Sequence, residues 1–400
     1  MLVREKQERL RITMADNRTV REYTRELVFA SFENRVPKSL PENLTMEECV
    51  DLCLRGQMQY LMFKSLLKIA EGTPEFNTIR TALNRSTITT FLQVMVARQI
   101  STAFEEQGIN HQLLKGSVLK GIYPSPEMRD MSDIDLVVYD ESLDRAADVM
   151  KKMGFKNHGL IKHHMIFTND QGIVVEVHWC LFDQNAGKNQ HLYFKDIRAK
   201  LSEGKQHTYE FGLEDFYIYM IAHMAKHFFE TGCGIRNLVD IYVYLNKYQE
   251  MMDEPYLQHE LDKCGILDFE KNVRELAYIW MDNRACPEFF EELFAYMVDS
   301  GIYGKTENGV WSQLAKEVQN KDDNIKLRYY FPSIDFMSEK YPWLKNVPFL
   351  LPVAWVIRGV TGVAQQQSRE HRRQIEGADK AKVDKMLNMY HRLNLNFRKG

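Results

Sequence analysis

The stretch MSDIDLVVYD, residues 131–140, decides the fold prediction. Ile134, Leu136 and the valines after them are aliphatic residues that suit a half-buried pleated strand. Successive side chains of a strand point to opposite sides, so Asp133 and Asp135 lie on one face. Two carboxylates at this spacing repel each other and raise each other's pKa unless a cation lies between them. The stretch therefore predicts a strand that carries a divalent-metal site.

A third carboxylate lies in the hairpin predicted for residues 163–179, HHMIFTNDQGIVVEVHW, whose two alternating runs flank the turn sequence NDQG. Glu176 stands among valines, and burying an unpaired carboxylate costs free energy. A neighbouring strand that carries Asp133 and Asp135 supplies the partner through shared metal ions. Three carboxylates from two strands suit two Mg²⁺ ions that hold a triphosphate.

The segment Lys115-Gly116-Ser117 follows a short apolar run and precedes a predicted helix. Glycine permits a tight backbone turn, and N–H groups that open a helix can bind phosphate. Ser117 adds a hydroxyl donor and Lys115 a positive charge. By itself the segment is more typical of an ordinary helix cap than of a phosphate site.

Several histidines have both a functional and a structural interpretation. His178 shares a strand face with Glu176, where it either orients the carboxylate or packs in the core. His163 and His164 are neighbours in a predicted strand, so we expect them to point to opposite sides. His223 and His227 lie one helical turn apart, a spacing that fits packing and hydrogen bonding better than a metal site without a third ligand.

The ordered set LLKGS (113–117), MSDIDLVV (131–138) and VVEVHW (174–179) resembles the nucleotidyltransferase superfamily, whose core resembles the palm of DNA polymerase beta. More narrowly, the chain is similar to a largely uncharacterised bacterial branch with helical N- and C-terminal regions. The further matching positions are Arg129, His223, His227, Arg236, Asp240 and the segment YPWLKNVPFLLPVAWVIR, residues 341–358. The resemblance extends over about residues 60–365. The interval between Ser117 and Asp133 is longer than the superfamily usually has, but it matches the narrower branch.

The resemblance implies an Mg²⁺-dependent nucleotidyltransferase that moves an NMP from an NTP to an acceptor hydroxyl or phosphate. Asp133, Asp135 and Glu176 would be both catalytic residues and ligands of two Mg²⁺ ions, with Mn²⁺ as the alternative. The implied nucleotide-binding residues are Lys115, Gly116, Ser117, Arg129 and Arg236. Arg129 either neutralises phosphate charge or pairs with Asp130. Arg236 either forms an i,i+4 pair with Asp240 or faces the nucleotide.

The expected fold class is α+β, with a small mixed-sheet nucleotidyltransferase core flanked by helical regions. We expect an N-terminal helical region over 1–95, the α/β core over 96–204 and a helical domain over 205–330. A C-terminal extension with a basic tail occupies 331–400.

Two other functions fit the same sequence. One is a nucleotide-binding pseudoenzyme or partner-binding scaffold without transfer activity. The other is an RNA-acting enzyme whose basic tail after Gln365 contacts phosphates. The sequence does not choose among ATP, CTP, GTP and UTP, and the acceptor is a small molecule, a protein or an RNA.

Composition limits the partners and the compartment. The formal net charge of −3 over 400 residues gives no global attraction to polyanions. The charged N-terminus has no apolar signal-peptide core, so we expect a cytoplasmic location. Cys49 and Cys53 share a predicted helix face and fit buried free thiols better than a zinc site. The apolar window 349–363 is too short for a span of ~20 residues. It predicts a packed helix or an interfacial membrane contact, without stable insertion.

Overall fold

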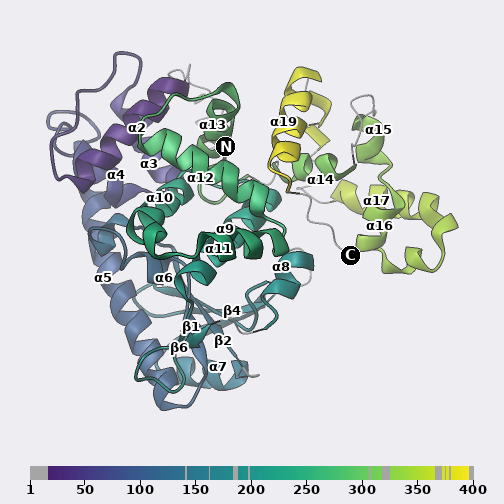
Figure 1. Ribbon diagram of the computed structural model, residues 1–400, viewed down its shortest axis with the longest axis horizontal. Helices are drawn as coiled ribbons and strands as arrows, with labels where there is room; N and C mark the ends of the chain where they lie inside the picture. Colours follow the sequence, from purple (N-terminus) through teal and green to yellow (C-terminus); the bar gives the residue numbers. More distant parts are fainter. Residues whose placement is uncertain are drawn as a thin grey trace.

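The computed structural model describes residues 17–139, 142–161, 163–182, 188–196, 199–305, 308–317, 325–364, 372–373, 375–377 and 380–395. Within these ranges a five-stranded mixed sheet lies at one end of the molecule, and most of the helices lie to one side of it (Figure 1). The predicted α+β class, with a small sheet between helical regions, is confirmed.

The sheet has the strand order β1-β2-β5-β4-β3. Its strands are β1 (His111–Leu113), β2 (Asp133–Val138), β3 (Lys156–Ile161), β4 (His164–Thr168) and β5 (Val174–His178). β2 and β5 pair in parallel, and the other neighbours are antiparallel. The predicted hairpin is β4–β5. β3 was not predicted, because its six residues are all exposed and show no alternation of apolar and polar side chains.

β2 is buried on both faces, which explains its almost continuous apolar sequence. Ile134, Leu136 and Val138 contact a core formed with α5 (Phe76–Glu106) and α7 (Leu143–Lys152). Val137 faces the other side and belongs to a larger core that the helical regions share. The two aspartates of β2 lie on this second side, by the period of the strand.

The larger core joins helices from distant parts of the chain. These are α2 (Asn17–Phe32), α3 (Met46–Gly56), α4 (Gln59–Leu66), α9 (Leu213–Glu230), α10 (Arg236–Tyr248), α11 (Glu254–Lys263), α12 (Leu267–Met281), α13 (Glu288–Ser300), α14 (Gly309–Glu317) and α19 (Lys380–Arg392). Cys49 and Cys53 of α3 are buried thiols in this core. The predicted boundary at residue 95 falls inside α5, and the domain limits stay a prediction.

The shorter elements are α6 (Gly116–Leu119), η1 (Pro126–Met128), α8 (Lys188–Tyr193), β6 (Lys200–Leu201), β7 (Tyr209–Glu210) and η2 (Gln249–Met251). A C-terminal lobe contains α15 (Ile325–Tyr330), α16 (Ile334–Lys340), η4 (Pro342–Lys345), η5 (Pro348–Leu350) and α17 (Leu351–Ala364), and lies to one side of the body (Figure 1). The predicted helix over 349–363 is confirmed as η5 and α17. No helix among the described residues is long and apolar enough to cross a membrane. Parts of the predicted basic tail, residues 365–371, 374, 378–379 and 396–400, lie outside the described residues.

The connector before β2, residues 124–132, is held by buried polar contacts. Lys120 donates through Nζ to the Arg129 carbonyl at 2.7 Å and to Thr90 at 3.0 Å. Burial lowers the pKa of Lys120 to about 7. Gln93 of α5 donates to the Met131 carbonyl at 2.8 Å. The connector therefore satisfies its backbone carbonyls with side chains of neighbouring helices, as buried carbonyls require.

A buried ion pair joins the same connector to α10. Arg129 Nε lies 2.6 Å from Asp240 Oδ1, and the Tyr123 hydroxyl donates to the same oxygen at 2.7 Å. The alternative in which Arg129 pairs with the Asp130 carboxylate is wrong, because the guanidinium reaches only the Asp130 carbonyl.

The predicted alternative in which Arg236 forms an i,i+4 ion pair with Asp240 is also wrong. Asp240 turns toward the connector, whereas Arg236 donates to Gln57 and to the Asp130 carbonyl. Each residue has found a partner outside its own helix.

Removing one partner of the buried pair should destabilise the fold strongly, because the other charge is left unpaired inside the protein. Arg129→Met or Asp240→Leu should each lower the free energy of unfolding by about 3–5 kcal/mol. The double variant should lose less than the sum of the two losses. Urea unfolding followed by circular dichroism measures all three values. The matched control is Glu22→Gln, which breaks the exposed Arg18–Glu22 pair and should cost under about 0.5 kcal/mol. Additive losses at Arg129 and Asp240 would contradict the pairing.

Candidate active site

A cavity of about 360 Å³ lies between the sheet, the connector and helices α9 and α10. Seven of the predicted site residues line it: Lys115, Gly116, Arg129, Asp133, Asp135, Glu176 and Arg236. Ser117 is not among the described residues that line the cavity. Its hydroxyl faces the Met131 sulfur at 3.9 Å, and its amide donates to the Leu114 carbonyl at 3.2 Å.

The carboxylates come together because β2 and β5 pair in parallel. Asp135 stands directly opposite Glu176 in the register of the two strands. Asp133 is two residues earlier on the same face of β2 and accepts a hydrogen bond from the Ser132 hydroxyl at 3.2 Å. The expectation that the strand of Glu176 adjoins the strand of the two aspartates is confirmed.

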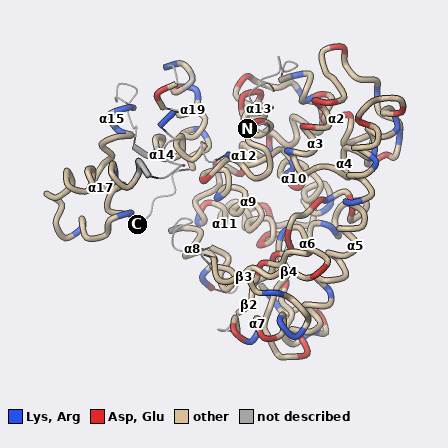
Figure 2. The backbone as a smooth tube through the Cα atoms, turned by 180° about the vertical axis from the view of Figure 1, so that it is seen from behind, with Lys and Arg blue, Asp and Glu red and all other residues tan. Residues whose placement is uncertain are grey.

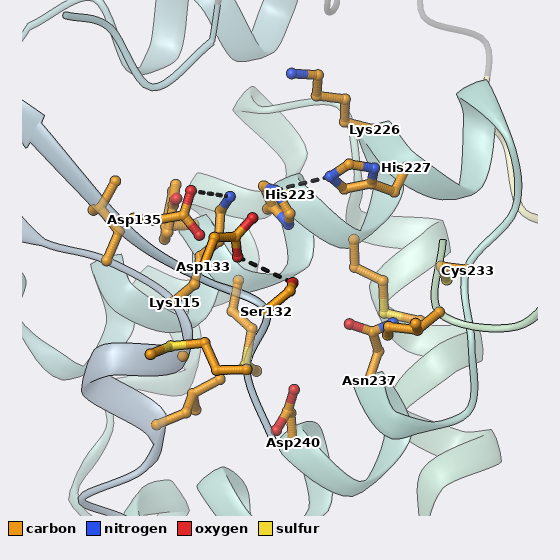
Figure 3. Close-up of a pocket in the computed structure, with 18 of the residues that line it drawn as sticks. Lys115, Ser132, Asp133, Asp135, His223, Lys226, His227, Cys233, Asn237 and Asp240 are labelled. Atoms are coloured by element: carbon orange, nitrogen blue, oxygen red, sulfur yellow. Dashed lines mark hydrogen bonds and ion pairs between the residues drawn. The ribbon is translucent and has the colours of Figure 1, made fainter. Parts of the chain in front are cut away.

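Asp135 is already neutralised within the protein. Lys115 Nζ lies 2.9 Å from Asp135 Oδ1 (Figure 3), and His178 Nε2 lies 3.0 Å from the same oxygen. Burial acts to raise the pKa of Asp135, but Lys115 and His178 outweigh it and hold this pKa below its ordinary value. His178 also lies 3.5 Å from Glu176 Oε2. These contacts favour the interpretation in which His178 orients the carboxylates over the one in which it only packs in the core.

Asp133 is in the opposite electrostatic situation. Burial raises the pKa of its carboxyl to about 6, and the neighbouring charge of Asp135 adds to the increase. The charge of Asp135 is therefore well compensated, whereas Lys115 and Ser132 compensate the charge of Asp133 only in part. A cation bound between them would remove this imbalance.

The backbone at Lys115 is strained. Its φ of 43° and ψ of −115° fall in a region that L-residues rarely adopt and that favours glycine. Such a conformation costs about 1–3 kcal/mol and is retained where the surrounding structure imposes it. The turn directs the ammonium at Asp135. Gly116 follows because a Cβ there would lie 2.5 Å from the Met131 sulfur.

The wall opposite the aspartates comes from α9, as Figure 3 shows for His223 and His227. Their Nε2 atoms lie 3.0 Å apart, so one ring donates to the other. Burial lowers the pKa of His227 to about 3 and that of His223 well below its ordinary value, so both are neutral near pH 7. Tyr219 and Lys226 also line the cavity and were not predicted. The signal that could have found them is their helical spacing from the two histidines.

The prediction that His163 and His164 point to opposite sides is wrong, because both line the cavity. His163 precedes β4 in a turn, where the alternation of strand side chains does not apply. His164 Nε2 lies 3.7 Å from Glu176 Oε1.

The donor atoms fit a divalent cation. Ligand atoms of Asp135, Glu176 and His178 lie within 4.8 Å of one another, and so do those of His163, His164 and His178. Carboxylate oxygens suit Mg²⁺ and Mn²⁺, whereas imidazoles suit transition metals such as Zn²⁺ better than Mg²⁺. Asp133 lies outside both groups and adjoins Asp135 along β2.

The two aspartates should affect the stability of the metal-free protein in opposite directions. Because the pKa of Asp133 rises from 3.8 to about 6 on folding, the folded state binds more protons between these values. The free energy of unfolding therefore falls as the pH rises through this window. Asp133→Asn removes the fall and should be more stable than wild type at about pH 7, by roughly 1–3 kcal/mol.

Asp135→Asn should instead be less stable, by about 3 kcal/mol, because it leaves Lys115 without its closest partner. Stability that depends on a lowered carboxyl pKa is present near neutral pH and is lost as the pH falls. Urea unfolding in EDTA from about pH 4 to pH 7 tests both variants. Asp144→Asn, at an exposed residue in the first turn of α7, is the matched control and should lower the free energy of unfolding by no more than about 1 kcal/mol, the interaction of its charge with the helix dipole. Changes of the same sign at Asp133 and Asp135 would contradict this account of the site.

Comparisons with known proteins agree with the predicted resemblance. No curated protein matches the chain. An antigenic nucleotidyltransferase-like protein from Paracoccidioides brasiliensis is a similar solved structure, with 16% identity and a TM-score of 0.29. The similarity covers 48% of this chain and 91% of that one, and its TM-score is too low to bear on the fold or the function.

The family described as "Uncharacterised nucleotidyltransferase" matches residues 42–282. This range includes both carboxylate-bearing strands, the connector and the helix that forms the opposite wall. Since the match extends over more than half of the sequence, the chain belongs to this nucleotidyltransferase family.

Proposed function

We propose that the protein is an Mg²⁺-dependent nucleotidyltransferase that transfers an NMP from an NTP to an acceptor hydroxyl or phosphate. The observation that carries this proposal is the position of Asp135 opposite Glu176, with Asp133 on the same face, in a cavity of about 360 Å³. Binding sites for small molecules commonly have volumes of about 300–1,000 Å³.

Asp133, Asp135 and Glu176 would hold the cations, with Mn²⁺ as the alternative ion. Bound divalent cations neutralise the charge that develops on the transferred phosphate. Asp133 gains most from such an ion, because its own carboxyl is the least compensated of the three. Glu176 has a lowered pKa, since burial is outweighed by the hydrogen bond with His178, and it stays ionised as a ligand requires.

Arg236 and Lys115 are the proposed contacts to the triphosphate. The Nε atom of Arg236 is buried and has no hydrogen-bond partner among the described residues. Burial and the nearby Arg129 lower its pKa to about 10, so the guanidinium remains charged at neutral pH. Arg129 would contribute indirectly, by holding the connector before β2 against α10, because its Nε already donates to Asp240. Gly116 would bring the backbone close to the phosphates, whereas the hydroxyl and amide of Ser117 are engaged within the protein.

In the reaction, an acceptor oxygen attacks the α-phosphorus in line, the bond to the bridging oxygen breaks, and pyrophosphate leaves. The protein contributes by positioning both substrates, an effect that supplies up to about 7–11 kcal/mol in favourable cases. Glu176 would lie beside the acceptor oxygen. We place the reaction in the cytoplasm, with which the buried thiols of Cys49 and Cys53 agree.

Calorimetric titration of each of the four NTPs, with Mg²⁺ and with EDTA, tests the proposal. One NTP should bind in Mg²⁺, and EDTA should abolish the binding. Asp133→Asn/Asp135→Asn should weaken the Mg²⁺-dependent affinity by more than about 100-fold, because two metal ligands are lost. The exposed Asp144→Asn should bind as wild type does.

The same titrations separate the alternatives. Binding that persists in EDTA and in the double variant would contradict a metal-held triphosphate. Metal-dependent binding of an NTP, without release of pyrophosphate in the presence of any small-molecule, protein or RNA acceptor, would identify the pseudoenzyme instead.

A further inference from the structure

An exposed apolar surface lies on the C-terminal lobe, away from the cavity. Along η5 and α17, five aliphatic or aromatic side chains are 38–76% exposed: Phe349, Val353, Val356, Ile357 and Val360. Their spacings of three and four residues place them on one side of the helix. We call these five residues the α17 stripe. Single exposed apolar side chains are common on proteins, but a contiguous set of this kind marks a contact surface.

The opposite side of α17 is fixed to the lobe. Ala354 is fully buried, and Trp355 Nε1 donates to the Pro332 carbonyl at 3.0 Å. Arg358, the one charged residue between 349 and 364, donates to the Tyr329 carbonyl at 2.8 Å. Its guanidinium also lies 5.4 Å from the centre of the Tyr329 ring. The α17 stripe is therefore uncharged and held in place.

The charge of the chain is divided unequally. Residues 325–400 contain 14 Lys and Arg but 6 Asp and Glu, whereas residues 1–324 contain 38 and 49. Figure 2 shows Lys and Arg on the lobe that carries α15 and α17, and on α19 beside it. Among the described residues, the exposed cationic residues of the lobe and of the chain after it are Lys326, Lys340, Lys345, Arg373, Lys380, Lys385 and Arg392. Residues 325–364, which form the lobe that carries the stripe, contain 5 Lys and Arg against 2 Asp and Glu, and the rest of the excess lies in the chain after them. The apolar stripe thus belongs to a lobe of net positive charge in an otherwise acidic protein.

An anionic lipid bilayer matches both features together. Aliphatic side chains enter the boundary between headgroups and acyl chains, and neighbouring ammonium groups attract acidic headgroups. RNA would match the cationic excess and the exposed ring of Phe349, but not the four aliphatic side chains of the stripe, because single strands are bound through stacking on aromatic rings. An α-helix of 14 residues is about 21 Å long, which suits a helix in the plane of the interface. We propose that the α17 stripe binds the protein peripherally to a bilayer that contains anionic phospholipid.

The test is flotation of the full chain with phosphatidylcholine vesicles, with and without about 30 mol% phosphatidylglycerol. The protein should bind the anionic vesicles, and binding should fall several-fold between about 50 and 300 mM NaCl. Val356→Ser/Val360→Ser keeps the net charge and removes apolar surface, so it should weaken binding at least tenfold. Ile88→Ser/Phe91→Ser, at two exposed apolar residues of α5, is the matched control and should bind as wild type does.

Failure of the wild type to bind anionic vesicles would overturn the inference, and so would undiminished binding by the Val356→Ser/Val360→Ser variant. Sedimentation velocity and titration with a short single-stranded RNA complete the test. If the stripe variant dissociates a dimer and does not change vesicle binding, the stripe is an interface between copies. If the protein binds RNA and no vesicles, the cationic region is a nucleic-acid-binding surface and the inference is overturned. None of these results depends on the metal site.

Discussion

The structure depends most on the opposition of two carboxylates, Asp135 and Glu176, across the parallel pair formed by β5 and β2, a strand that is buried on both faces. Like charges in such a place are unfavourable unless other groups compensate them. Lys115 and His178 provide part of this compensation, and the strained backbone at Lys115 keeps its ammonium at the required position. The remaining imbalance falls on Asp133. The cluster of carboxylates on β2 and β5 is therefore the origin both of the proposed metal binding and of the unfavourable electrostatic energy of the site.

The connector before β2 links the carboxylate-bearing strand to helices from other parts of the chain. Its carbonyls and its Arg129 side chain are held by residues of α5, α6 and α10. The position of Asp133, directly after the connector, is consequently set by helices from distant parts of the sequence. Such networks are strong when every member is satisfied, which explains the presence of a buried lysine with a lowered pKa at Lys120.

The sequence predicts the parts of the site that follow from local periodicity. The alternation of β2 and β5 places their carboxylates on one face, and the turn after β4 identifies the hairpin. Contacts between distant segments could not be predicted in this way. Asp240 pairs with Arg129 of the connector and not with Arg236 of its own helix. His163 lines the cavity because it lies in a turn, where strand alternation does not apply. β3 was not predicted because all of its side chains are exposed, so its sequence shows no apolar alternation. Only its backbone pairing with β4 identifies it as a strand.

The core shared by the helical regions has a consequence for how substrates enter. The helix that carries Tyr219 and His223 is anchored in that core along most of its length, and so is Val137 on the strand that faces it. Neither wall can swing as a lid without separating close-packed side chains. The width of the cleft is thus set by the packing of the core, and a substrate of the proposed reaction would meet a preorganised space rather than one that closes around it. Preorganisation of this kind reduces the entropy lost on binding, because few groups remain to be ordered.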